Sequence, residues 1–277
     1  MIIVHSTHPG WLSNAYLIAP REGGEAVVVD SGAPLGPIFG AIGTGRLRLR
    51  AVLTTHRHPD HVAGHPEIRR RTGATILALE GESEFVEDSV PVRDGQDLAW
   101  DGLAVRALRL PGHTRFHGGF LVAGVGLFTG DFLFAGSFGS TVRAGPDGFE
   151  AARRALFEHV LGLPDETAVY PGHGATTTVG RERTTNPFLR VLTGLDPEGS
   201  GPCRVRGRTA RLIVLARQFD GRNKAWIRFE DDGTDARVVE PVGAGELQPH
   251  PPAAAVAGAV LPGERHARHA EELVEGA

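Results

Sequence analysis

Cysteine and lysine are almost absent from this chain of 277 residues. Cys203 is the only cysteine, and Lys224 is the only lysine among 29 basic residues. A single cysteine excludes an internal disulfide and any four-cysteine zinc or iron–sulfur site. It also suits a reducing compartment, and the N-terminus lacks the basic segment followed by an apolar one that marks a secretory signal. We therefore expect a cytoplasmic protein.

Two further absences narrow the function. The chain contains no run of about 18 apolar residues, so we expect no membrane span. Its formal net charge is -4, without the basic surplus of a nucleic-acid-binding surface. We therefore expect neither a membrane nor a nucleic acid as a partner. Hydrophobic residues make up 41% and charged residues 22%, as in folded globular chains, and the 13 histidines stand out.

Short apolar segments bounded by glycine, proline and polar residues predict a mixed fold for the first 200 residues. Helices are expected over 65–72, where Gly73 follows as a stop, and over 148–161. Because the segments alternate, polar loops that follow strands can meet at one rim of a sheet sandwich. We expect strands over 14–19, 26–30, 51–54, 75–79, 103–110, 119–122, 126–129 and 167–170.

The composition changes after Pro202. Strands are expected over 211–219, 224–230 and 235–240, with Asp-Gly hairpin turns between them. We divide the chain into a catalytic domain at 1–200, a small β-rich appendage at 203–242 and a Pro/Ala-rich tail at 243–277. The appendage hairpin carries Arg217, Arg222 and Lys224, which could bind an anionic group, although we expect a solvated hairpin.

The segment from residue 56 to residue 61 reads His-Arg-His-Pro-Asp-His and follows a predicted strand. In extended backbone the side chains of His56 and His58 lie on one face, so both imidazoles can reach one ion. Pro59 bends the chain, which lets Asp60 and His61 point to a neighbouring position. Histidine and aspartate are ligands for zinc, iron or manganese. The alternative, a loop whose polar residues simply face solvent, gives no reason to gather four such groups.

Three more candidate ligands each lie beside a glycine after a predicted strand: His113, Asp131 and His173. Glycine lets the backbone approach a ligand closely. His117 is nearer to the motifs and could support a ligand, although we do not count it among the candidate ligands. The remaining histidines are expected at the surface or as caps: His5, His8, His65, His159, His250, His266 and His269.

With this ordered set of motifs the sequence resembles the metallo-β-lactamase fold superfamily, and within it the glyoxalase II-like metallohydrolases. The resemblance covers roughly residues 1–195. It implies an α+β fold, a four-layer αββα sandwich, to which the appendage is added. It also implies a site for two divalent metal ions, zinc in the first place, with iron or manganese as alternatives. The first ion would take His56, His58 and His113; the second would take Asp60, His61 and His173; Asp131 would bridge them.

Particular residues distinguish branches of the superfamily. Lactamases with a cysteine ligand resemble this chain poorly, because Cys203 lies outside the motifs. The Thr-Gly-Asp turn at Asp131 points toward the glyoxalase II-like group. In glyoxalase II a helical C-terminal region holds glutathione, whereas this chain predicts strands there, and Ser140 stands where related sequences often place an arginine.

The function that follows is metal-dependent hydrolysis of a small-molecule thioester or related acyl ester by a metal-bound hydroxide. Asp60 would bind an ion and orient the nucleophile. One alternative is a mononuclear iron persulfide dioxygenase that uses His56, His113 and Asp131. Another is a non-catalytic metal-bound binding module. Lactones and phosphodiesters are further substrates of the same fold, and the substrate, the metal and the oligomeric state are left open.

Overall fold

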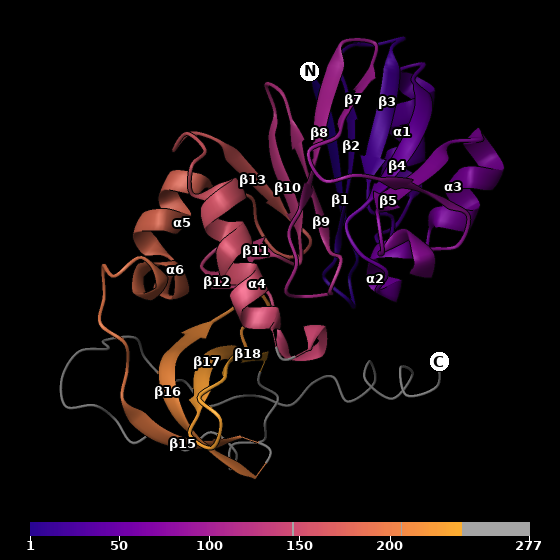
Figure 1. Cartoon of the computed structure of the whole chain (residues 1–277). Helices are drawn as coiled ribbons and strands as arrows, with labels where there is room; N and C mark the ends of the chain where they lie inside the picture. The colour runs from indigo at the N-terminus through magenta and orange to yellow at the C-terminus, as the bar shows by residue number, and fades with distance from the viewer. Residues whose placement is uncertain (146, 206, 240–277) are drawn as a thin grey trace.

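Two six-stranded sheets form the centre of the structure, which is a computed structural model that describes residues 1–145, 147–205 and 207–239 (Figure 1). Within each sheet the strands are neighbours in an order that follows the chain closely. The first sheet has the order β1 (Ile2–Thr7), β2 (Asn14–Ala19), β3 (Glu25–Val29), β4 (Arg48–Thr54), β5 (Thr75–Leu79), β6 (Ser89–Val92). The second has the order β14 (Thr177–Thr178), β13 (Ala168–Pro171), β10 (Gly126–Gly130), β9 (Gly118–Val122), β8 (Leu103–Arg109), β7 (Asp97–Trp100).

The two sheets pack face to face through apolar side chains. Leu53 and Ile18 of the first sheet share one buried cluster with Phe120, Val105 and Phe128 of the second. Burying such aromatic and branched side chains drives the sheets together. The alternating apolar residues of both sheets therefore form the central core.

Helices cover the outer faces of both sheets. The first sheet is covered by α1 (Gly36–Thr44) and α3 (His65–Thr72), through Ile38 and Ile68. The second is covered by α4 (Gly148–Ala155), which continues as a π-helical turn (Leu156–Val160), and by α5 (Val179–Thr185) and α6 (Pro187–Leu192). The expected four-layer αββα sandwich is thus confirmed.

The remaining short elements lie in the connections. They are the single helical turn α2 (Pro59–Val62), the 3-10 turns Ser83–Phe85 and Val142–Ala144, and the hairpin β11 (Leu133–Phe134) with β12 (Ser137–Phe138). Among the described residues, none of the helices combines the length and the apolar character needed to cross a membrane.

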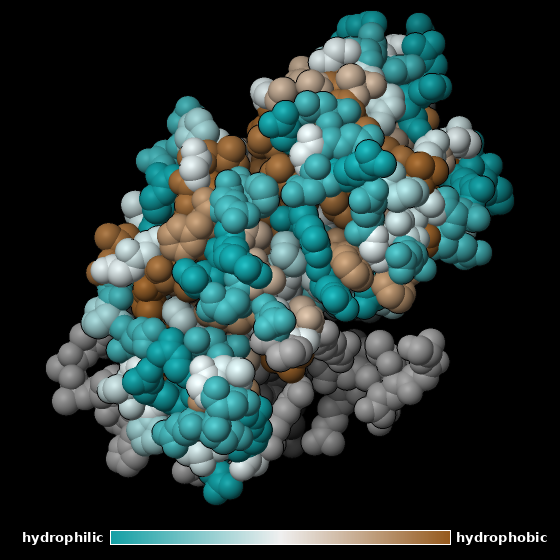
Figure 2. All heavy atoms as spheres, viewed as in Figure 1, coloured by the Kyte–Doolittle hydropathy of each residue, from teal (hydrophilic) through white to brown (hydrophobic). Residues whose placement is uncertain are grey.

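A separate antiparallel sheet, the appendage sheet, follows the sandwich. It contains β15 (Gly201–Val205), β16 (Arg208–Arg217), β17 (Asn223–Phe229) and β18 (Asp235–Val239). In Figure 1 it lies below α4, α5 and α6, and in Figure 2 its outer surface is mostly hydrophilic. The sequence predicted three of these strands and missed β15, whose Gly201 and Pro202 resemble a linker. The division at residues 200 and 203 stays our proposal, and the tail at 243–277 lies outside the described residues.

Candidate metal centre

The candidate ligands follow strands whose carboxyl ends meet at one edge of the sandwich. The segment from His56 to His61 follows β4, which runs parallel to β3. Asp131 follows β10 and His173 follows β13, and these two strands are parallel. His113 follows β8, which has the same direction as β10 because both are antiparallel to β9. Both sheets therefore contribute loops to one edge.

The loop after β4 is held in a tight bend. His58 has extended backbone and precedes Pro59, which begins the one-turn helix α2. That helix contains Asp60 and His61. It packs so closely on Gly32 that a β-carbon there would lie 1.6 Å from the Asp60 carbonyl oxygen. The turn therefore places Asp60 and His61 beside the extended segment, with the centroid of the His61 ring 4.1 Å from that of the His56 ring.

His56, His58 and His113 form the first group of converging side chains. The His58 Nδ1 atom lies 3.0 Å from the Nε2 atom of His56 and 3.0 Å from that of His113. The Nδ1 atom of His113 lies 3.2 Å from the Ser140 carbonyl oxygen, so its Nε2 atom faces the centre. Two ligands of a tetrahedral zinc ion, each at about 2.05 Å, lie about 3.3 Å apart. The spacing of the group is close to that value.

Asp60, His61 and His173 form the second group. The Asp60 Oδ2 atom lies 3.5 Å from the His61 Nε2 atom and 3.3 Å from the His173 Nε2 atom. The ligand atoms of each group lie within 4.8 Å of one another. The structure thus brings all six residues together, as two groups of three.

Asp131 lies between the two groups. Its Oδ2 atom is 3.4 Å from the His113 Nε2 atom, and its Oδ1 atom is 3.3 Å from the His61 Nε2 atom and 3.4 Å from the His173 Nε2 atom. One carboxylate oxygen therefore faces each group, which is the placement that a bridging ligand requires.

The donor atoms fit divalent cations. The His61 Nε2 and Asp131 Oδ1 atoms are buried, and neither has a hydrogen-bond partner among the described residues. Buried polar atoms in proteins are nearly always satisfied, so such atoms need a reason. A cation that accepts electron pairs from both would satisfy them, and imidazole and carboxylate are its ordinary ligands.

The protonation states of the metal-free groups differ. Burial lowers the pKa of His113 to about 3 and the pKa of His56 well below its usual value. Burial also acts to lower the pKa of His173, but the carboxylates of Asp131 and Asp60 outweigh it and raise the pKa to about 9. In the first group the imidazoles of His56 and His113 are ready to bind a cation at pH 7, whereas His173 must first release a proton.

Asp30 supports the second group and was missed by the sequence analysis. This buried carboxylate accepts hydrogen bonds from the Thr55 amide at 2.8 Å and the Thr55 hydroxyl at 2.7 Å. Its Oδ2 atom also lies 2.8 Å from the His61 Nδ1 atom. Such a carboxylate orients the imidazole so that the opposite nitrogen faces the ion. Asp30 follows β3, so its place at a strand end was the signal that could have found it.

Glu82 and His117 support other parts of the centre. The Glu82 carboxylate is buried and accepts hydrogen bonds from the Arg57 amide at 2.8 Å and the Thr114 hydroxyl at 3.0 Å. It thereby ties the loop of His58 to the loop of His113. The Nε2 atom of His117 accepts a hydrogen bond from the Asp131 amide at 3.1 Å.

Two expectations about burial were wrong. His65, expected at the surface or as a cap, is buried, and its ring nitrogens lie 2.6 Å from the Ser31 hydroxyl and 2.8 Å from the Thr54 hydroxyl. It begins α3, and the side chain faces the first sheet. Lys224, expected in a solvated hairpin, is 2% exposed. One face of that hairpin packs against the sandwich, which its sequence pattern does not reveal.

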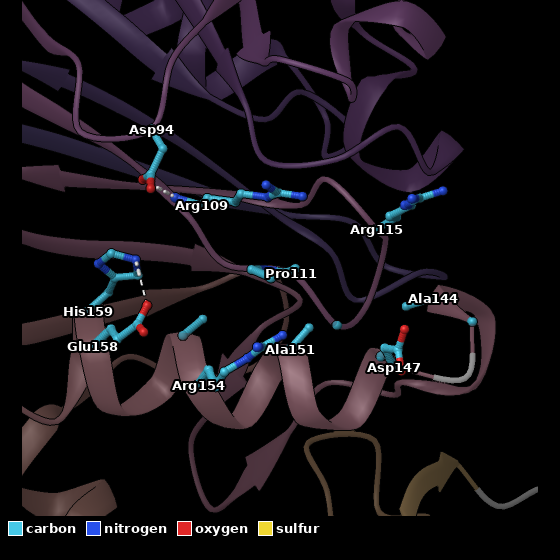
Figure 3. A pocket seen from close by; sticks show the side chains of 14 residues that line it. Asp94, Arg109, Pro111, Arg115, Ala144, Asp147, Ala151, Arg154, Glu158 and His159 are labelled. Atoms are coloured by element: carbon cyan, nitrogen blue, oxygen red, sulfur yellow. Dashed lines mark hydrogen bonds and ion pairs between the residues drawn. The ribbon is translucent and has the colours of Figure 1, made fainter. Parts of the chain in front are cut away.

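A groove of about 760 Å³ runs along the outer side of the His113 loop, between that loop and α4 (Figure 3). Arg109 and Arg115 line one wall, and Arg154 of α4 lines the other, with carboxylates among them. The seven converging residues are absent from its described lining. The groove is therefore a neighbouring surface rather than the centre itself.

Residues 8–173 match the model of the metallo-beta-lactamase superfamily, which is more than half of the chain. The chain belongs to the metallo-beta-lactamase superfamily. The match ends before the appendage sheet begins at Gly201.

Several individual proteins are similar to this chain. An uncharacterised protein of Mycobacterium tuberculosis is 35% identical over 211 residues, which cover 65% of this chain and 94% of that protein. A protein named hydroxyacylglutathione hydrolase, from Methylococcus capsulatus, is 32% identical over 205 residues, 73% of each chain. The solved structure of ETHE1 from Myxococcus xanthus superposes with a TM-score of 0.59 at 28% identity, covering 71% of this chain and 92% of that one.

Proposed function

We propose that this protein is a binuclear metallohydrolase that cleaves a small-molecule acyl thioester or a related ester. The observation that carries the proposal is the paired arrangement of ligand atoms with one carboxylate between the two groups. Similarity to a protein named hydroxyacylglutathione hydrolase supports a thioester as substrate. We retain the expected cytoplasmic location as part of the proposal.

The chain would hold the first ion with His56, His58 and His113 and the second with Asp60, His61 and His173, and Asp131 would be a ligand shared by the two groups. Divalent cations held there would supply a hydroxide nucleophile near neutral pH and would polarise the carbonyl oxygen of the substrate. Zinc suits this donor set, and iron and manganese remain alternatives.

The protein's own residues perform the remaining tasks. Asp60 is the more solvent-accessible of the two carboxylates, with a side chain 24% exposed against 11% for Asp131. Asp60 is therefore placed to accept a hydrogen bond from the nucleophile and to orient it. Asp30 and His117 hold His61 and the Asp131 loop, so these donors need not reorganise when substrate binds.

The test combines metal analysis with an acyl-transfer assay. Chelator-treated protein should lose hydrolysis of small thioesters and regain it with zinc, manganese or iron, and elemental analysis should find two ions per chain. His58→Ala should lower kcat/KM by about a hundredfold or more. His159→Ala, a half-buried histidine outside the centre, is the matched control. Undiminished turnover in metal-free protein would reject the proposal.

The dioxygenase alternative predicts different results. It requires one iron at His56, His113 and Asp131, and the His113 and Asp131 side chains do lie 3.4 Å apart. Oxygen consumption with glutathione persulfide, with one iron per chain and no thioester turnover, would replace our proposal. Bound metal without either reaction would favour a binding module.

A further inference from the structure

The imidazole of His173 is held differently from those of three other candidate ligands. In those three, the ring nitrogen turned away from the centre has a polar partner, and such contacts fix the orientation of a ligand ring. The contacts join the Nδ1 atom of His56 to the Thr55 hydroxyl at 3.1 Å, that of His61 to the Asp30 carboxylate at 2.8 Å and that of His113 to the Ser140 carbonyl oxygen at 3.2 Å. The Nδ1 atom of His173 is buried, and it has no hydrogen-bond partner among the described residues. Another kind of contact must therefore set the plane of this ring.

The backbone around His173 is tied to the first sheet. The side-chain amide of Asn14 in β2 donates hydrogen bonds to the carbonyl oxygens of Pro171 and Gly174, both at 3.0 Å. The Tyr16 hydroxyl, also in β2, donates to the Pro171 carbonyl oxygen at 2.8 Å. These bonds fix the position of the His173 α-carbon. They leave the imidazole free to turn about its two side-chain bonds, and the second of these has a broad range of favourable angles in histidine.

Two aromatic rings enclose the His173 imidazole. The Phe219 ring stacks on it, with centroids 4.8 Å apart and planes 12° apart. The Phe134 ring meets it at an angle of 70° with centroids 6.0 Å apart, and it contacts the Phe219 ring at 5.1 Å. Aromatic rings prefer such stacked and edge-on arrangements. Gly174 leaves the space for the stacked ring, because a β-carbon there would lie 2.7 Å from the Phe219 β-carbon. The two phenylalanines thus restrict His173 as hydrogen bonds restrict the other rings.

Phe219 belongs to the turn that joins β16 to β17 in the appendage sheet. The turn is closed by the Gln218 amide, which donates a hydrogen bond to the Arg222 carbonyl oxygen at 2.9 Å. The sheet itself is attached to the sandwich, since the Trp226 ring packs on Phe149 of α4 with centroids 5.0 Å apart. The ring that stacks on His173 therefore comes from a well-supported turn, in a part of the chain beyond the family match at residues 8–173.

We propose that Phe219 is a positioning residue that sets the plane of the His173 imidazole and thereby completes the second metal position. This inference rests on the proposed binuclear centre. With the ring held by stacking, the His173 Nε2 atom faces the carboxylates of Asp60 at 3.3 Å and Asp131 at 3.4 Å before an ion binds. A ligand that is already oriented loses less conformational entropy when the ion binds, so the affinity for the ion is higher. The appendage sheet is thereby part of the metal centre.

Metal titration of the full-length chain tests the inference. Metal-free protein is titrated with zinc at pH 7 in competition with a chromophoric chelator. Phe219→Leu keeps an apolar side chain but loses the flat ring, so it should lower the affinity for one of the two ions about three- to tenfold, with the other affinity nearly unchanged. Phe219→Tyr keeps the ring and should bind both ions like wild type. The control is Phe229→Leu, at the other end of β17, where the ring packs on Arg208 of the same sheet. Wild-type affinities for both ions in Phe219→Leu would overturn the inference.

Nuclear magnetic resonance of the zinc-loaded protein, with labelled histidine and phenylalanine, gives a second readout. In wild type the His173 ring protons should show nuclear Overhauser effects to the Phe219 ring. They should also resonate upfield of their positions in Phe219→Leu, because they lie over the face of an aromatic ring. Should Phe219→Leu fail to fold, the absence of these effects in wild type overturns the inference. Two bound ions without thioester hydrolysis would reject the proposed function alone, and the affinities would still decide the role of Phe219. A wild-type chain that binds fewer than two ions would overturn both.

Discussion

In the proposed binuclear centre, replacement of Asp30 by asparagine should weaken the second metal position while every candidate ligand stays unchanged. Asp30 accepts hydrogen bonds from both the amide and the hydroxyl of Thr55, and its Oδ2 atom lies 2.8 Å from the His61 Nδ1 atom. An asparagine keeps one acceptor oxygen and loses the charge, so at least one of these bonds is lost. Hydrogen bonds to a charged group contribute about 1.5–3 kcal/mol each. We expect the free energy of unfolding to fall by about that amount.

The same substitution should lower the affinity for the second ion by about ten- to hundredfold, because residues that orient ligands have effects of that size. Competition with a chromophoric chelator at pH 7 measures the two affinities, and urea unfolding measures stability. Asp97→Asn is the control, since Asp97 is an exposed partner of Arg106 far from the centre in the second sheet's edge strand. A variant at Asp30 that binds both ions as tightly as wild type would refute the orienting role.

Three further predictions follow from the geometry. Gly172→Ala should weaken metal binding about tenfold or more, because a β-carbon there would lie 2.5 Å from the Asp131 Oδ1 atom. Gly162→Ala should leave metal binding unchanged, because nothing lies within 4 Å of a β-carbon at that position. Competition with a chelator measures the metal affinity of both variants. The pKa of His173 is raised to about 9, so the imidazole releases its proton as the pH rises from 7 to 9, and metal affinity should rise over that range and then level off. The stability that the protonated imidazole gives the metal-free protein is lost over the same range. A flat affinity across these pH values contradicts the assignment. Phe120→Ala should destabilise the protein by about 3–5 kcal/mol in urea unfolding, since the ring is fully buried between the sheets.

The convergence of the candidate ligands could be predicted because their local signals agree. Apolar strands, glycine turns and the spacing of His56, His58, Asp60 and His61 all point to one rim, and the structure brings these side chains together. Asp30 satisfies the same strand-end rule. It was missed because a single aspartate before Ser-Gly is also a common turn residue.

Burial in the appendage could not be predicted in the same way. The alternation of side chains in 224–230 defines two faces but does not state which face meets another part of the chain. Lys224 and Trp226 therefore appeared to belong to an independent hairpin, and only the contact of Trp226 with Phe149 reveals the buried face. Similarly, β15 was missed because register with β16, rather than its own composition, makes it a strand.

The candidate ligands come from loops of two different sheets, so the distances between them depend on how the sheets are placed relative to each other. In the proposed arrangement each ion is held by side chains from loops of both sheets, as with His58 and His113, or Asp60 and His173. Sliding of one sheet over the other by a fraction of an ångström would change every distance between those donors. Metal occupancy would then depend on how well the facing surfaces of the two sheets fit, although most of those surfaces lie far from the ions. A substitution in the middle of the sandwich could therefore abolish activity while every candidate ligand stays unchanged.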